Sequence, residues 1–102
     1  MNAVKVQYTV KEDYVETNKA NIQQVMADLK ALNDPAVKYA AFLLDDGKSF
    51  VHFVMRENDE AQKTISELPS FQEFQRQLRE SGPEVPPQAE NLTAVGSSWA
   101  VF

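Results

Sequence analysis

Apolar and polar residues alternate at the start of the chain. Between Ala3 and Val10 every second residue is a valine or tyrosine, and the residues between them are mostly polar. A period of two places one set of side chains on each face of a strand, so this segment predicts a half-buried strand. The positions that share the apolar face are Val4, Val6, Tyr8 and Val10.

The period then changes to that of a helix, from about Glu12 to Asn33. Asp13 followed by Glu16 fits a capping pair at the start, and the sequence Asn33-Asp34-Pro35 predicts the end. One polar residue, Asn18, falls within the apolar stripe of this helix. The rest of the stripe is Val15, Ile22, Val25, Leu29 and Leu32.

Two further apolar runs, 37–45 and 48–57, are separated by Asp46-Gly47. An Asp-Gly pair between such runs predicts a two-residue type I′ hairpin, because both turn residues need positive φ. The hairpin pairs residue 45 with 48 and therefore places His52 opposite Ala41. The same register places Phe50 opposite Leu43 and Val54 opposite Tyr39.

Both faces of this hairpin are apolar, since Phe42, Leu44, Val51, Phe53 and Met55 lie on the face away from His52. Two helices can cover only one face of a sheet. A second copy of the chain is the simplest cover for the other face, so we expect a homodimer.

The second half of the chain predicts another helical region and a last strand. Asn58 is expected to cap a helix that Pro69 interrupts, and Ser70 with Glu73 fits a new capping box for a segment ending near Gly82. Residues 82–91 contain three prolines and are expected to form an extended connection, with the last strand over 92–102.

The element order is therefore β-α-β-β-α-β within one domain, residues 1–102. Two split β-α-β units of this kind form an α+β, ferredoxin-like fold, in which a four-stranded antiparallel sheet carries two helices on one face.

Composition narrows the function classes. The 102 residues include fifteen acidic and ten basic side chains, a net charge of −5, and no basic cluster. These counts argue against partners such as nucleic acids and anionic membranes. The chain has no cysteine, and its N-terminal stretch lacks the apolar core of a signal peptide, so we expect a cytoplasmic protein.

The candidate chemistry centres on His52, the only histidine. An unperturbed imidazole titrates near neutrality and could act as a general base while Asn18 stabilised an oxyanion. The alternative is that His52 is a hydrogen-bonded core residue, with Asn18 as a partner or as a cap. The residues expected to line a pocket beside them are Tyr39, Phe50, Ile22 and Val54. No ligand spacing supports a metal site, and no cofactor motif is present.

The stretch VKYAAFLLDDGKSFVHFV, the later LPSFQEFQRQL and the early Asn18 together resemble the antibiotic-biosynthesis-monooxygenase-like family. The resemblance implies a dimeric α+β barrel with a pocket between helices and sheet in each subunit. Monooxygenases of that family place a tryptophan at the end of the third strand, where this chain has Met55-Arg56-Glu57. Haem-degrading relatives use a histidine on the second helix, which is absent here.

Two hypotheses follow. In the first, the chain is a cofactor-independent, monooxygenase-like enzyme or a small-molecule binder that acts on an aromatic or polyketide-like ligand. In the second, it is a non-catalytic homodimeric domain, structural or ligand-binding and regulatory.

Overall fold

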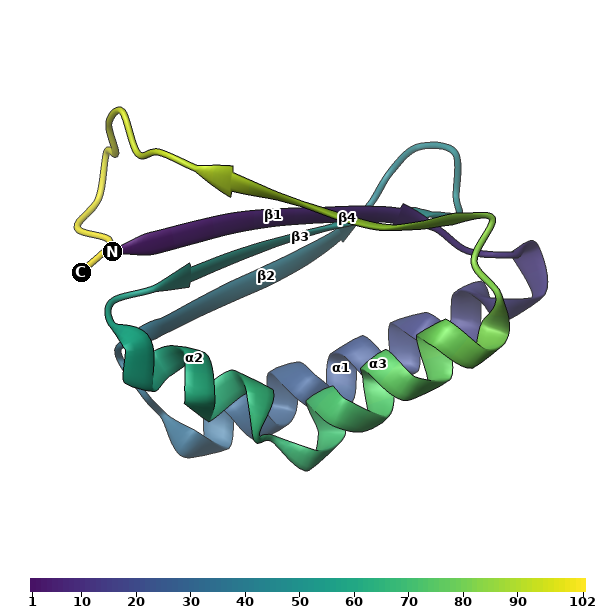
Figure 1. The fold of residues 1–102 in the computed structure, drawn as a ribbon, viewed down its shortest axis with the longest axis horizontal. Coiled ribbons are helices and arrows are strands. Elements are labelled where there is room, and N and C mark those ends of the chain that lie inside the picture. The colour runs from purple at the N-terminus through teal and green to yellow at the C-terminus, as the bar shows by residue number, and fades with distance from the viewer.

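Four antiparallel strands form one sheet in the computed structural model, which describes all residues from 1 to 102 (Figure 1). The sheet order is β2-β3-β1-β4, the order of the predicted ferredoxin-like arrangement. The strands are β1 (Asn2–Thr9), β2 (Val37–Leu43), β3 (Ser49–Arg56) and β4 (Val85–Leu92).

The helices all lie on one face of this sheet (Figure 1). A short 3₁₀ turn, η1 (Glu12–Tyr14), leads into α1 (Val15–Leu32), and Pro69 divides the second helical region into α2 (Asp59–Ser66) and α3 (Pro69–Ser81). Gly82 ends α3 in the left-handed conformation, as predicted.

One of the three predicted helix caps is present. The Asn58 side chain accepts a hydrogen bond from the backbone N–H of Ala61, at 3.0 Å. The other two predictions were wrong. Asp13 lies inside η1, and Ser70 lies inside α3 because Pro69 takes its first position, so neither stands where a cap would.

The hairpin register is as predicted, with His52 opposite Ala41, although the turn is different. The loop has four residues, 45–48, closed by the bond from the Leu44 N–H to the Ser49 carbonyl at 2.8 Å. Gly47 alone has positive φ, and the Asp46 carboxylate accepts from the N–H groups of Lys48 and Ser49. The strand register is the same because the predicted two-residue loop, 46–47, and the observed four-residue loop, 45–48, are centred on the same peptide bond.

The last strand was predicted in the wrong place. β4 spans Val85–Leu92, so all but its last residue lies within the expected connection, and residues 93–102 form no regular element. Pro86 and Pro87 are tolerated there because β4 is an edge strand, and they sit where its pairing with β1 shifts register.

The core lies between the helices and the β1–β3 half of the sheet. Its buried cluster consists of Tyr8, Val10, Val15, Val25, Phe50, Phe74 and Leu78. The opposite face of the sheet has no helix over it (Figure 1). None of the helices is long and apolar enough to span a membrane.

Candidate functional site

His52 lies at the centre of the interior, where both of its ring nitrogens are hydrogen-bonded. The alternation of β3 turns it toward the helices, and only 2% of its surface is exposed. Nε2 lies 2.8 Å from the Tyr8 hydroxyl on β1, and Nδ1 lies 2.7 Å from the Tyr39 hydroxyl on β2. The imidazole thus links three neighbouring strands.

Asn18 belongs to the same network, although it does not contact His52 directly. Its Nδ2 donates to the Tyr8 hydroxyl at 2.9 Å, so Tyr8 stands between the amide and the imidazole. Asn18 is fully buried, and its Oδ1 has no hydrogen-bond partner. The four side chains therefore form one continuous hydrogen-bonded network, in the order Asn18, Tyr8, His52 and Tyr39.

The orientation of the Asn18 amide sets the direction of the hydrogen bonds in this network. The Tyr8 oxygen already accepts from Asn18, and its hydroxyl hydrogen has one remaining partner, Nε2 of His52. A neutral imidazole carries one N–H, which is then on Nδ1 and donates to the Tyr39 oxygen. The hydroxyl hydrogen of Tyr39 is thereby left free for a further acceptor.

Burial also keeps the side chains of this network uncharged. Desolvation disfavours the charged form of each group, and it lowers the pKa of His52 from 6.5 to about 4. The same cause raises the pKa of both Tyr8 and Tyr39 well above the ordinary value for tyrosine. At neutral pH the network therefore consists of uncharged hydrogen-bond donors and acceptors.

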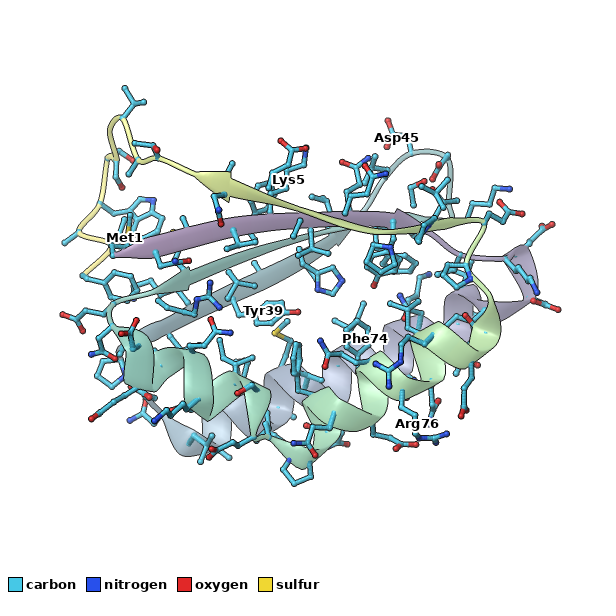
Figure 2. All side chains as sticks on the ribbon, viewed as in Figure 1. Met1, Lys5, Tyr39, Asp45, Phe74 and Arg76 are labelled. Carbon is cyan, nitrogen blue, oxygen red and sulfur yellow. The ribbon has the colours of Figure 1, made fainter.

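A cleft of about 510 Å³ lies between the sheet and the α2–α3 pair, and His52, Tyr8 and Tyr39 border it. Figure 2 shows Tyr39 and Phe74 in the space between sheet and helices, one from each layer. Much of the remaining wall is apolar, including Val4, Val6, Val54, Ile65, Phe71 and Leu78.

Tyr39 also borders a second cleft, of about 580 Å³, between α1 and the β2 edge of the sheet. Its side chain is half-buried and stands where the two spaces come together. Of the two tyrosines in the network, Tyr39 is the less buried and is therefore the better placed to meet a ligand.

The residues expected to line one pocket are divided among three places. Tyr39 and Val54 border the first cleft together with Tyr8 and His52, whereas Ile22 borders the second cleft. Phe50 lines neither; it is buried and stacks on Tyr8, with ring centroids 5.6 Å apart. No group of three or more histidine, cysteine, aspartate or glutamate side chains is arranged to hold a metal ion.

Tyr8 is the member of the network that we did not predict from the sequence. The alternation of the first strand places Tyr8 on the apolar face, and the ferredoxin-like order places that strand beside β3. The pairing of Val6 with His52 then brings Tyr8 next to the imidazole. The information was present, but it required pairing two strands that are distant in the sequence.

The fold and the site define an α+β domain of ferredoxin-like topology with a ligand-sized cleft beside a buried polar network. No family model matches the chain, and the search of curated proteins found no similar sequence. Solved structures do match over nearly the whole length of this chain, and several are described as known or putative antibiotic biosynthesis monooxygenases. The chain has the fold of the antibiotic biosynthesis monooxygenase-like proteins.

Three of these structures illustrate the likeness. Rv0793 from Mycobacterium tuberculosis is similar with a TM-score of 0.78 at 16% identity, covering 96% of this chain and 98% of that chain. An antibiotic biosynthesis monooxygenase gives 0.74 at 12% identity, covering 94% and 100%. SnoaB, a cofactor-independent oxygenase from Streptomyces nogalater, gives 0.70 at 14% identity, covering 95% of each chain.

Proposed function

We propose that the cleft beside His52 binds a small ring compound and that Tyr39 donates a hydrogen bond to an electron-rich oxygen of that compound. The observation that carries this proposal is that Tyr39, whose hydroxyl lies 2.7 Å from Nδ1 of His52, borders a largely apolar cleft. With the proton of the imidazole on Nδ1, the Tyr39 hydroxyl hydrogen is available to a ligand. A volume of about 510 Å³ is in the range of small-molecule sites. Aromatic or polyketide-like compounds, which combine flat apolar rings with carbonyl oxygens, suit such a lining.

The chemistry that this arrangement supports is stabilisation of negative charge on the ligand oxygen. When a carbon next to a carbonyl loses a proton to hydroxide from solvent, charge develops on the carbonyl oxygen, and a donor held in place lowers the energy of the anion. His52 is a positioning residue in this scheme, because its Nδ1–H orients the Tyr39 oxygen. The resulting carbanion is oxidised directly by O₂, which gives one oxygen atom to a new carbonyl at that carbon while its other atom leaves as water; SnoaB is described as a cofactor-independent oxygenase.

The test uses anthrone, a tricyclic ketone with an acidic C–H, and the variant Tyr39→Phe. We expect the unmodified chain to bind anthrone and the variant to bind it about tenfold more weakly, the loss of roughly one hydrogen bond. Binding is followed through the imidazole NMR signals, which are unambiguous because the chain has one histidine. Tyr14→Phe is the matched control, since the Tyr14 hydroxyl has no partner and does not border the cleft.

Oxygen consumption separates the enzyme from the alternative function. Binding accompanied by O₂ uptake above the rate of anthrone alone supports an oxygenase, with uptake reduced in Tyr39→Phe. Binding without uptake supports a ligand-binding regulatory domain, a reading that the burial and low pKa of His52 also favour. If anthrone leaves the imidazole signals unchanged, the cleft does not bind this class of compound.

The second part of the proposal is a homodimer formed through the open face of the sheet. Its β2–β3 half is mostly apolar, with Phe42 55% exposed and its ring centroid 6.1 Å from that of Phe53, although Lys38 lies on the same face at the start of β2. The β1–β4 half carries Lys5 and Glu90 at paired positions, and Lys5 projects from the open face in Figure 2. A second copy of the chain would bury the aromatic half and leave the charged half at the rim.

We expect twice the mass of one 11.5 kDa chain in multi-angle light scattering at micromolar concentration. Phe42→Glu places a charge in the proposed contact and should shift the mass to that of a monomer. Gln88→Glu, on the exposed edge strand β4, is the control and should leave the dimer intact. A monomer mass for the unmodified chain would contradict the proposal.

A further inference from the structure

The charged side chains that border the first cleft are both cationic. Arg56, at the end of β3, and Arg79, in the last turn of α3, both border it. No aspartate or glutamate does, although the chain has fifteen acidic side chains against ten basic ones. The charge of the cleft wall is therefore opposite in sign to that of the whole chain.

Neither of these arginines has a carboxylate partner within the chain. The ion pairs of the structure involve Lys19, Lys48 and Arg76. Arg76, on the same helix as Arg79, pairs with both Glu73 and Glu80 and projects away from the sheet (Figure 2). The arginine outside the cleft is thus neutralised, and the two that border it are not.

Arg56 is the better placed of the two to bind a ligand. It is half-buried on a strand, and its Nη2 donates to the side-chain carbonyl of Asn2 at 2.6 Å. This bond holds one edge of the guanidinium without cancelling its charge, and the other N–H groups remain available. Arg79 is exposed on a helix and stands at the opposite end of the cleft, since β3 and α3 end at opposite sides of the molecule (Figure 1).

We infer that the ligand is an anion: a ring compound with a carboxylate or a comparably acidic oxygen, bound by the Arg56 guanidinium while the ring lies on the apolar wall. A planar guanidinium matches a carboxylate through paired N–H groups, and an unpaired cation beside apolar side chains gains more from such a partner than one in open water. This inference rests on the proposed function, because it assigns a ligand class to the same cleft. Arg79 adds attraction at the far end.

The test compares 1-naphthoate with 1-naphthamide, two probes of one shape that differ in charge. We expect the unmodified chain to bind the carboxylate about tenfold more tightly than the amide, the effect of one charge-assisted contact near the surface. Arg56→Gln should abolish this preference and leave the affinity for the amide nearly unchanged. Arg76→Gln, which removes an arginine outside the cleft, should preserve the preference.

The outcomes separate this inference from the proposed function. Equal binding of the two probes, with both shifting the imidazole signals of His52, would overturn the anionic ligand and leave the ring-binding cleft standing. Binding of neither probe would overturn both. A preference for the carboxylate that Arg56→Gln retains and Arg79→Gln abolishes would move the anion to the other end and overturn the role of Arg56.

Discussion

His52→Ala should reduce the free energy of unfolding by about 3 kcal/mol. The substitution leaves a void among side chains that are nearly fully buried, and Phe74 loses the ring whose centroid is 5.5 Å from its own. It also removes the acceptor of the Tyr8 hydroxyl, and a buried donor without a partner costs about 1–3 kcal/mol. Denaturant unfolding followed by circular dichroism measures the difference.

The control for this measurement is Thr17→Ala, beside Asn18 on α1. Thr17 is exposed and outside the polar network, so its unfolding free energy should change by no more than about 0.5 kcal/mol. A loss below about 1 kcal/mol for His52→Ala would show that the imidazole contributes little to the core. His52 would then have no evident reason to be there other than ligand chemistry.

Stability should fall as the pH is lowered from about 6.5 to about 4, and the fall should depend on His52. The pKa of His52 is about 4 in the folded protein and near 6.5 when exposed, so the unfolded chain binds the proton more readily in this window. Its contribution is fully present above pH 6.5 and is lost as the pH drops through the folded pKa. A shift of this size corresponds to a loss of about 3 kcal/mol.

The measurement is the difference in unfolding free energy between the unmodified chain and His52→Gln at several pH values. Glutamine can occupy the same two hydrogen bonds without titrating, so the difference isolates the imidazole. Other groups, such as Glu73, whose pKa the Arg76 guanidinium lowers to about 2, titrate in both proteins and cancel. A difference that stays constant from pH 7.5 to 4.5 would contradict the assignment, as would an imidazole NMR signal that titrates near 6.5.

The strand pairings show what the sequence could predict and what it could not. The position of His52 followed from an Asp-Gly turn, and it stayed correct although the loop has four residues, because the centre of the loop determines the register. The prediction misplaced β4 because its prolines argue against a strand. The predicted ferredoxin-like order puts the last strand at an edge, where prolines are tolerated, but the composition of 92–102 was given more weight.

The tail shows a related limit. Residues 93–102 are rich in apolar side chains, a composition typical of a strand, yet Val95 is fully exposed and no strand of the sheet pairs with this segment. Local composition reports the capacity to form a strand, whereas pairing depends on a neighbour. The prediction of the site had the same limit. It identified Asn18 and His52, but it missed Tyr8, the residue between them, because Tyr8 lies on a third element, β1.

The unpartnered oxygen of Asn18 has a consequence for ligand choice. If the amide were turned so that this oxygen faced Tyr8, the Tyr8 hydroxyl would donate to it, the imidazole proton would move to Nε2, and the Tyr39 hydroxyl would donate to Nδ1. Tyr39 would then offer the cleft a lone pair where it now offers a proton. In the proposed function, a single buried amide on α1 that borders neither cleft would thereby set whether Tyr39 offers the ligand a donor or an acceptor, with no change in the shape of the cleft.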